Sequence, residues 1–526
     1  MPSEVPPPDA GSEVAAVFVL AAGQGTRMRS ARPKVLHPLA GRPMLWHALT
    51  AAAGLAPRRL VAVIGHGRDE VQEYLASAGD LAALPLATAV QAEQLGTGHA
   101  VQCALAETGP VRGTVVVTYG DVPLLRAETL RTLADEHVRA GNAVTVLTAQ
   151  VADPTGYGRI ARDASGAVTA IIEHRDAAGD PALLAIREIN SGVYAFDGDM
   201  LADALGRLST GNAQGERYLT DVVRLAREAG RPVGTVQAED PDEIEGVNDR
   251  VQLAAMARTL NERLVRRAQL AGVTVHDPAT TYLHADVTIG ADTELLPGTH
   301  LQAGTSIGSG CRIGPDTTLI ACTVGDGATV LRSHCHDARI GDGAKVGPFT
   351  HLRPGSVVGP RAEVGAFVEV KKARIDAGAK AHHLAYLGDA VVGERANIGA
   401  GVITANYDGV AKSITDIGAD SFVGSNATLV APVTIADGAY VAAGSTVTDT
   451  VEPGDLAVAR GRQHNSTGWV LRRRAGTRSE RAARDAGAGL SAQAAEAGLS
   501  AQAAGAGPTG QHTGTGPDAT EGQPTS

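Results

Sequence analysis

Large aromatic side chains are scarce in this chain of 526 residues, where Phe, Trp and Tyr together make up 3% of the sequence and 64 residues are glycine. A chain of this length needs more than one hydrophobic core, and so few large side chains supply several ordinary cores poorly. A thin, turn-rich solenoid needs fewer of them, because each repeat packs on its neighbours. We therefore expect two or three domains, at least one of them repetitive.

The sequence is also poor in cysteine and in long apolar runs. Its four cysteines are widely spaced and form no CxxC pair; they are Cys103, Cys311, Cys322 and Cys335. This spacing implies no disulfide framework and is typical of reduced thiols. No apolar run approaches the roughly 18 residues of a membrane span, and the first residues, MPSEVPPPDAGSEV, lack a basic signal region. We expect a soluble, cytoplasmic protein with no membrane partner.

Positive charge is in deficit, with 46 Lys and Arg against 57 Asp and Glu and a net charge of −11. Such a balance argues against a broad nucleic-acid-binding surface. Small anionic substrates remain compatible with it, because a few local Arg and Lys residues outweigh a distant acidic surface.

Apolar runs alternate with helical patterns from residue 14 to 247. VFVL, RLVAVIG, GTVVVTYGD and AVTVLTA have the character of strands, and AETLRTLADEHVRA that of a helix. This alternation predicts an α/β domain with a mainly parallel sheet, whose ligands bind beyond the carboxyl ends of the strands. LAAGQGTRM (20–28) and TYGDVPL (118–124) fall there. The sequence of residues 248–271 predicts a linking helix that is capped at Asn248 or Asp249.

A six-residue repeat begins at about residue 272 and continues to about residue 470. Aliphatic residues recur every six positions at 289–319, 340–370 and 417–447, as Ile, Leu or Val. Such hexads predict a parallel β-helix of about nine triangular coils, each strand pointing one aliphatic side chain inward. The pattern breaks at 380–390 and 404–416, where we expect loops suited to chemistry. Residues 1–13 and the low-complexity stretch 471–526 are predicted to be disordered.

The segment LAAGQGTRM joins a strand to a glycine-rich turn. Met28 replaces the third glycine of a dinucleotide fingerprint, and no Gly-Lys-Ser/Thr follows as in a P-loop. Gly23 allows close backbone approach to a phosphate, while Arg27 and Lys34 supply two cations. A purely structural turn has the same composition, so this motif alone leaves both interpretations open.

Polar residues after other apolar runs suggest a ligand site. Asp121 ends a strand where a carboxylate binds Mg²⁺ on substrate phosphates, although a helix N-cap is the alternative. Gln91 carries an amide that donates and accepts side by side, as uracil requires, next to Gly96 and Thr97. Other polar groups suit sugar hydroxyls and a second metal ligand; they are Gly158, Glu173, Asn190 and Asn248.

Charged and aromatic residues also interrupt the repeat. Arg353 and Lys371 suit a sugar phosphate, and His383 lies three residues before Tyr386. A solvated coil face is the alternative for the two cations, as is an ordinary loop histidine for His383. SHCHDA (333–338) lacks further ligands at zinc spacing. WVLRRRAG (469–476) is typical of a solvated basic tail, and contact with the phosphates of CoA is the alternative.

The order LAAGQGTRM, QAEQLGTGHA, YGDVPL, PTGYGRI, EHRDA, EINSG and EGVNDR, followed by hexads, resembles the bacterial bifunctional N-acetylglucosamine-1-phosphate uridyltransferases and glucosamine-1-phosphate acetyltransferases. The resemblance covers about residues 14–470. It implies a Rossmann-like nucleotidyltransferase domain, a left-handed β-helix, and a homotrimer that uses UTP, acetyl-CoA and Mg²⁺ to make UDP-N-acetylglucosamine.

The resemblance also implies roles for single residues. UTP or the UDP-sugar would contact Leu20, Ala21, Gly23, Lys34, Gln91, Gly96, Thr97, Tyr119, Gly158, Glu173, Asn190 and Asn248. Mg²⁺ would be held by Asp121 and Asn248, with Arg27 and Lys34 neutralising charge. Glucosamine 1-phosphate would contact Arg353, Lys371, Tyr386 and Asn397, with His383 as general base. Acetyl-CoA would contact Ala400, Asn406, Tyr407, Ser425, Ala443 and Arg460.

Two residues depart from the family pattern. Gln24 stands where a basic residue is common, and His382 where a small one is usual, so spacing selects His383 as the base. Two rival interpretations remain: a single-activity nucleotidyltransferase whose β-helix is only a scaffold, and a guanylyl or adenylyl transferase. The insertions containing HHLAYLGDA and TANYDG argue against the scaffold interpretation, because a scaffold needs neither. Whether the enzyme transfers a uridylyl, guanylyl or adenylyl group depends on whether Gln91 faces the base.

Overall fold

The computed structural model describes residues 13–177, 179–212 and 214–488. Its first part holds a mainly parallel sheet, as predicted, in which β10 alone runs antiparallel to its neighbours β6 and β7 along the main strand order. That order is β11 (Val233–Gln237), β7 (Val144–Gln150), β10 (Glu188–Asp197), β6 (Thr114–Tyr119), β1 (Val14–Ala21), β4 (Leu60–Ile64) and β5 (Leu86–Val90). The hairpin of β8 (Arg159–Arg162) and β9 (Val168–Ile172) pairs with β10.

Helices cover both faces of this sheet because strand side chains alternate between faces. All eight residues of β1 are buried: Val17 and Val19 pack in one core, whereas Phe18 and Leu20 pack in the other. The first core includes α1 (Met44–Ala53), α2 (Arg68–Ser77) and α5 (Ala127–Arg139). The second includes α4 (Thr97–Thr108), α7 (Gly198–Gly206) and α8 (Asp221–Glu228). Short helices α3 (Gly79–Ala82) and α6 (Pro181–Leu184) complete this part.

The predicted linking helix is α9 (Arg250–Leu270), and Asp249 caps it by accepting hydrogen bonds from the amides of residues 251 and 252. Near its start, Met256 packs with Met28 and other apolar residues of the α/β part. Near its end, Leu264 and Val265 belong to the core of the repetitive part. The helix therefore contributes to the cores on both sides of it.

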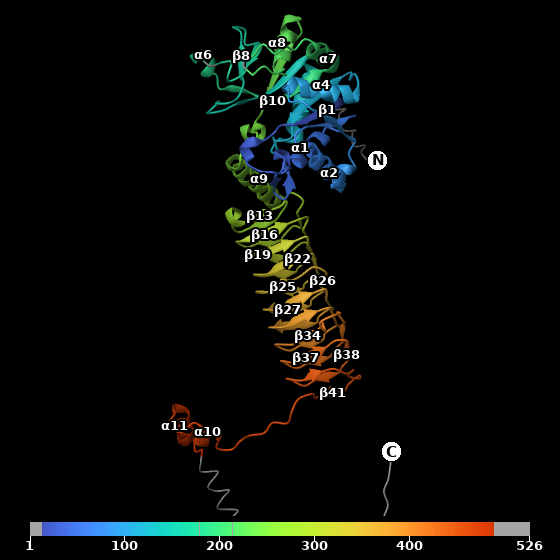
Figure 1. Cartoon of the computed structure of the whole chain (residues 1–526), viewed down its shortest axis with the longest axis vertical. Helices are drawn as coiled ribbons and strands as arrows, with labels where there is room; N and C mark the ends of the chain where they lie inside the picture. Colours follow the sequence, from blue (N-terminus) through green and yellow to red (C-terminus); the bar gives the residue numbers. More distant parts are fainter. Residues whose placement is uncertain (1–12, 178, 213, 489–526) are drawn as a thin grey trace, which may run out of the picture. The chain divides into compact units, whose positions relative to one another are not determined.

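The repetitive part is a parallel β-helix built from short strands in three sheets (Figure 1). The first sheet has 11 strands, from β12 (Thr274–Val275) to β41 (Leu456–Ala457). The second has 10, from β13 (Tyr282–Leu283) to β40 (Thr446–Val447), and the third has 9, from β14 (Thr288–Ile289) to β38 (Val433–Ile435). The inward aliphatic residues from the three hexad runs form one continuous core, which confirms the prediction.

One predicted interruption is wrong. Residues 380–388 are regular strands, β30 (Lys380–His383) and β31 (Tyr386–Gly388), and Ala381 and Leu387 point into the core. The preceding inward residues, Val370 and Ile375, are five positions apart, so a shorter corner shifts the hexad register without inserting a loop. The second interruption is confirmed: residues 406–414 leave the coil after β34 (Ile403–Ala405), and an isolated bridge pairs Tyr407 with Lys412.

The described residues from Arg460 to residue 488 belong to a separate compact unit. Its described part contains α10 (Trp469–Arg473), which overlaps the start of the stretch predicted to be disordered, and α11 (Arg478–Asp485), which lies within that stretch. Residues 1–12 and 489–526, which hold the rest of the predicted disorder, lie outside the described residues. Within the described ranges, no helix is both long and apolar enough to span a bilayer.

Candidate functional site

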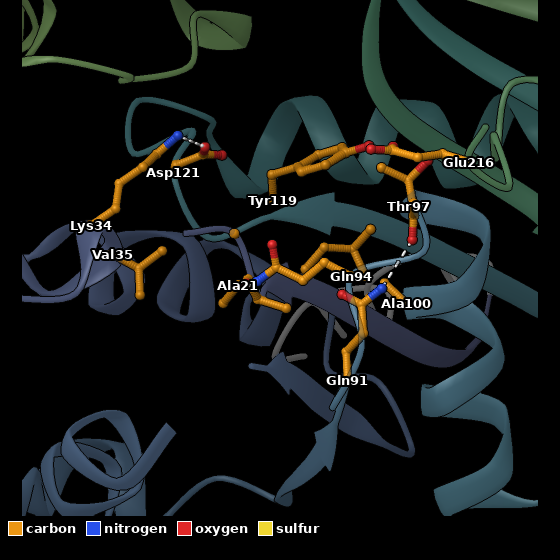
Figure 2. A pocket seen from close by; sticks show the side chains of 14 residues that line it. Ala21, Lys34, Val35, Gln91, Gln94, Thr97, Ala100, Tyr119, Asp121 and Glu216 are labelled. Carbon is orange, nitrogen blue, oxygen red and sulfur yellow. Dashed lines mark hydrogen bonds and ion pairs between the residues drawn. The ribbon is translucent and has the colours of Figure 1, made fainter. Parts of the chain in front are cut away.

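A cavity of about 250 Å³ lies at the carboxyl ends of β1 and β6. The chain runs from β1 through β4 and β5 on one side and returns to β6 on the other, so this is the point where the strand order reverses. The structure brings these predicted residues to its wall: Leu20, Ala21, Gly23, Lys34, Gln91, Gly96, Thr97, Tyr119 and Asp121 (Figure 2). Segments distant in sequence therefore build the wall of one cavity.

A second cavity, of about 440 Å³, adjoins the first. The predicted residues on its wall are Arg27, Gly158, Glu173, Asn190 and Asn248. Thr97, Tyr119, Asp121 and Glu216 line both cavities. Groups bound in the two cavities would meet beside Asp121.

Two glycines of the first cavity differ in their surroundings. A methyl group added at Gly23 would meet no atom within 4 Å, so this backbone is open to the cavity. Gly96 precedes α4 with φ of 100° and ψ of 178°, a region that is essentially restricted to glycine. A methyl group there would lie 2.7 Å from the carbonyl oxygen of Arg217. The backbone at Gly23 is therefore open to a ligand. At position 96, the backbone conformation and the contact with Arg217 require glycine.

The ammonium of Lys34 lies between the side chains of Asp121 and Asn248. Its Nζ forms an ion pair with Asp121 Oδ2 and donates a hydrogen bond to Asn248 Oδ1 at 3.0 Å (Figure 2 shows the ion pair). The Lys34 and Asp121 side chains are only 11% and 22% exposed. Two oxygens that are 127 positions apart in the sequence thus converge on one cation, and carboxylate and amide oxygens are the ligands that suit Mg²⁺. The residues present fit the expected metal.

The second cavity contains an acidic group in a poorly hydrated position. Burial raises the pKa of the Glu173 carboxyl, although a hydrogen bond from Thr220 Oγ1 at 3.4 Å opposes this shift. Burial also raises the pKa of the Tyr119 hydroxyl, which stays neutral and able to donate. The side-chain oxygen of Asn190 accepts from the Gly192 amide at 2.9 Å, and the same side chain hydrogen-bonds the buried Tyr194, so Asn190 is held in place on the cavity wall. These groups suit neutral hydroxyls.

In the β-helix, His383 lies at the corner where the chain passes from the first sheet to the second, which we call the first corner. The strands pair Ala381 with Ile398, Ile398 with Val423, and Val423 with Val441. Two residues after each paired position stand His383, Ala400, Ser425 and Ala443, so the predicted base and three predicted acetyl-CoA residues form one column. Within the described chain, His383 has no side-chain hydrogen bond, and its ring makes an edge contact with His382 at 5.8 Å between centroids.

Arg353 and Lys371 lie at another corner, between the second and third sheets, which we call the second corner. They follow Leu352 and Val370, which pair in β25 (His351–Leu352) and β28 (Glu369–Lys371). Arg353 Nη1 lies 2.9 Å from Glu369 Oε1, and Lys371 Nζ lies 3.4 Å from Asp389 Oδ2. Within one chain, the two predicted cations therefore lie at a different corner of the β-helix from His383.

Other predicted residues divide between these corners. Asn406, one of the predicted acetyl-CoA residues, donates a hydrogen bond to Asp389 at the second corner and therefore does not join the column of His383. Tyr407 is 59% exposed, with its hydroxyl donating to the Gly409 carbonyl at 2.6 Å. Tyr386 in β31 and Asn397 in β33 (Asn397–Ile398) are half-buried on the second and first sheets. Arg460 lies in the separate C-terminal unit.

Sequence reasoning missed four polar residues at these sites. Glu216 and Gln94 line the first cavity, and Gln94 Nε2 donates to the Ala22 carbonyl at 2.7 Å, which holds the glycine-rich turn. Asp389 joins Lys371 and Asn406, and Glu363 accepts from His382 Nε2 at 2.8 Å. Gln94 and Asp389 lie inside the quoted motifs QAEQLGTGHA and LGDA, which were the available signal.

The zinc alternative at SHCHDA has a structural obstacle. In β22 (His334–His336), His334 and His336 are exposed whereas Cys335 is buried in the core, because alternate side chains face opposite sides of a strand. The thiol and the imidazoles therefore do not share a face.

Comparison with known proteins gives consistent matches along the chain. Residues 17–205 match the MobA-like NTP transferase domain, and residues 286–321, 337–372 and 415–449 match the bacterial transferase hexapeptide (six repeats). Bifunctional protein GlmU of Streptomyces avermitilis is 55% identical over 471 residues, covering 89% of this chain and 96% of the relative. The chain belongs to the GlmU family.

Two further GlmU proteins are similarly close. That of Corynebacterium diphtheriae is 52% identical over 90% of this chain and 97% of its own length. That of Kineococcus radiotolerans is 52% identical over 90% and 95%. The resemblance and the fold predicted from the motifs are confirmed: a nucleotidyltransferase domain precedes a hexapeptide β-helix in a bifunctional transferase.

Proposed function

We propose how this bifunctional enzyme of UDP-N-acetylglucosamine synthesis divides its two reactions among its residues. Uridylyl transfer takes place at the two adjoining cavities of the α/β domain, and acetyl transfer takes place along the corners of the β-helix. The observation that carries the first assignment is the shared wall at Thr97, Tyr119 and Asp121, where two bound substrates would meet.

In uridylyl transfer, UTP occupies the first cavity and N-acetylglucosamine 1-phosphate the second. An oxygen of the sugar phosphate attacks the α-phosphorus in line, and pyrophosphate leaves with the electron pair of the broken P–O bond. The open backbone at Gly23 admits the phosphates, while Glu173 and Asn190 position the sugar. Arg27, whose guanidinium has no hydrogen-bond partner among the described residues, neutralises charge on the leaving group.

Asp121 and Asn248 would hold Mg²⁺. When bound, the ion supplies Lewis-acid stabilisation of negative charge on phosphate oxygens. Lys34 contacts both of these residues and lines the first cavity, where its ammonium would pair with the phosphates of UTP.

In acetyl transfer, the amine of glucosamine 1-phosphate attacks the thioester carbon of acetyl-CoA, and His383 takes the proton that the amine loses. Collapse of the tetrahedral intermediate then expels the CoA thiolate, which takes up a proton. The column of Ala400, Ser425 and Ala443 offers small side chains and accessible backbone along which a thin, extended cofactor arm fits. Arg353 and Lys371 bind the sugar phosphate.

A complete acetyl-transfer site needs more than one copy of the chain, because His383 and the Arg353/Lys371 pair lie at different corners. The first corner also exposes apolar side chains: Phe349 and Phe367 stack at 5.2 Å and are 52% and 61% exposed, and Leu384 is 62% exposed. We place the first corner of one copy against the second corner of the next. Such a heterologous contact closes into a ring, and the family resemblance implies three copies.

Complementation tests this shared site. Differently tagged His383→Ala and Arg353→Ala chains are each expected to lose acetyl transfer, whereas purified mixed assemblies regain about one third of it, because one interface in a three-membered ring has both wild-type corners. Recovery of no activity in mixed assemblies that bind both affinity tags would contradict the shared site.

A direct assay tests the two activities. Full-length protein is incubated with glucosamine 1-phosphate, acetyl-CoA, UTP and Mg²⁺, each substrate is omitted in turn, and the products are weighed by mass spectrometry. We expect N-acetylglucosamine 1-phosphate without UTP and UDP-N-acetylglucosamine with all components. Uridylyl transfer without any acetylation would instead support the scaffold interpretation of the β-helix. We also propose a cytoplasmic location, consistent with four unpaired cysteines and with UTP and acetyl-CoA as substrates.

A further inference from the structure

The side-chain amide of Gln91 has an orientation that chemistry alone fixes. Gln91 is 5% exposed, and its amide lies 3.0 Å from the carbonyl oxygen of Gly96. A carbonyl oxygen only accepts hydrogen bonds, so the amide atom that faces it must be the nitrogen. Figure 2 shows this nitrogen turned toward the start of α4, near Thr97 and Ala100, and the oxygen turned away from them.

The second hydrogen of that nitrogen also has a partner. Gln91 Nε2 lies 3.3 Å from Nδ1 of His99, in the first turn of α4. Because the amide nitrogen donates, Nδ1 must be the unprotonated acceptor, and a neutral imidazole then carries its proton on Nε2. His99 Nε2 lies 3.7 Å from Sγ of Cys103, one helical turn further along. Burial raises the pKa of the Cys103 thiol, so the sulfur stays neutral beside this ring.

Both hydrogens of the Gln91 amide are therefore used inside the protein. Its Oε1 accepts no hydrogen bond from the described residues and remains as the polar atom that Gln91 offers to the first cavity. An oxygen accepts from the N3–H of uracil. Cytosine presents an unprotonated, electron-rich N3 at the same edge and would face this oxygen with repulsion.

We propose that His99 is a specificity-determining positioning residue, which holds the Gln91 amide with its oxygen toward the base and thereby selects uracil over cytosine. This inference rests on the proposed placement of the UTP base in the first cavity. Gly96 alone leaves one amide hydrogen unpartnered and the amide held by a single bond. His99 supplies the second bond, and rotation of the amide then costs two hydrogen bonds in place of one.

The test compares UTP with CTP, which differ in the base only at N3 and C4. The measured quantity is the ratio of kcat/KM for UTP to that for CTP, with N-acetylglucosamine 1-phosphate and Mg²⁺ and the full-length protein. In His99→Ala we expect this ratio to fall about tenfold, through a loss with UTP and a gain with CTP. His99→Asn, which keeps an acceptor oxygen near the position of Nδ1, is expected to restore most of the ratio.

Two matched variants make the result decisive. His66→Ala changes a histidine in the loop before α2 that makes no side-chain hydrogen bond to Gln91 among the described residues, and should leave the ratio unchanged. Gln91→Ala removes the group that contacts the base and should lower the ratio at least as far as His99→Ala. Acetyl transfer and the melting temperature, measured for every variant, confirm that the chain is folded.

The outcomes separate the inference from the function beneath it. An unchanged ratio in His99→Ala, with a lowered ratio in Gln91→Ala, would refute the role of His99 while keeping the base site. Equal losses with UTP and CTP in His99→Ala would also refute it, because a purely structural residue acts on both nucleotides alike. An unchanged ratio in Gln91→Ala would overturn the placement of the base itself.

Discussion

Replacing Gly23 and Gly96 separately by alanine should separate ligand binding from stability within one cavity. Both glycines line the first cavity, but only Gly96 has a positive φ and a crowded Cβ position. Gly96→Ala places a methyl group 2.7 Å from the Arg217 carbonyl oxygen and 2.9 Å from its nitrogen. Gly23→Ala places it in open space. The two variants add the same atoms and should have different effects.

The expected magnitudes follow from these surroundings. The backbone region of Gly96 costs other residues about 1 to 3 kcal/mol, and the contact with Arg217 puts the total near the upper limit, about 3 kcal/mol. For a domain of this size, that loss lowers the melting temperature by about 6 to 12 °C. Gly23→Ala should change stability by less than about 0.5 kcal/mol. It should nevertheless lower kcat/KM for UTP by about 10²-fold, because a methyl group displaces the phosphates from their productive position.

The two tryptophans allow a domain-specific assay. Trp46 lies in α1 of the α/β domain, and Trp469 lies in α10 of the C-terminal unit. In a Trp469→Phe background, thermal unfolding followed by fluorescence therefore reports on the α/β domain alone. Pyrophosphate release measures uridylyl transfer, and thiol release from acetyl-CoA serves as the internal control.

Two results would refute this reasoning. Equal destabilisation by both substitutions would mean that Gly23 is as constrained as Gly96. Full uridylyl-transfer activity in Gly23→Ala would mean that no phosphate approaches the backbone there, and the first cavity would need another occupant.

Four further predictions concern three single residues and the C-terminal segment. Asp121→Asn should abolish uridylyl transfer and leave acetyl transfer unchanged; loss of both activities in a folded protein would contradict separate sites. His383→Ala should lower acetyl-transfer turnover by about 10²- to 10⁴-fold with uridylyl transfer intact. A larger loss in His382→Ala, whose ring is held by Glu363, would reverse that assignment. Because burial raises the pKa of Glu173, folding favours its protonated form, and native stability falls as the pH rises above the usual 4.5. Glu173→Gln should therefore melt higher than the wild type at pH 8, with the difference shrinking toward pH 4, although sugar binding weakens; equal melting curves at both values would contradict it. Truncation after residue 476 should change neither activity, and a lower melting temperature would show that the removed segment packs on the enzyme.

The architecture was readable from the sequence because it depends on local periodicity. A period of six fixes which side chain of each strand points inward, whatever the neighbouring coil contains, and Leu295, Leu352 and Leu429 are accordingly fully buried. The glycine-rich turn and Asp121 were located for a similar reason, since each directly follows an apolar strand. Local signals of this kind survive without knowledge of the tertiary structure.

Other features depend on contacts between distant segments. The ion pair of Lys34 with Asp121 joins a segment that follows β1 to the end of β6, and only the strand order makes these two places neighbours. Asp389 and Asn406 meet because one coil lies on the next, so no spacing in the sequence reveals their hydrogen bond. The misread break at 380–390 has a related origin: a corner one residue shorter disturbs the period, although the strands on either side keep their pairing.

The dual packing of α9 bears on how the protein can be divided for separate study. The terminal coil of a solenoid has a neighbour on one side only, and at this end the other side is closed by Leu264 and Val265 of α9. A fragment starting at residue 272 would leave Val273, Val275 and Leu283 facing water, beside strand edges open to other chains. A fragment intended to retain acetylation alone should therefore begin at or before Asp249, so that α9 remains in the fragment and covers the first coil of the β-helix.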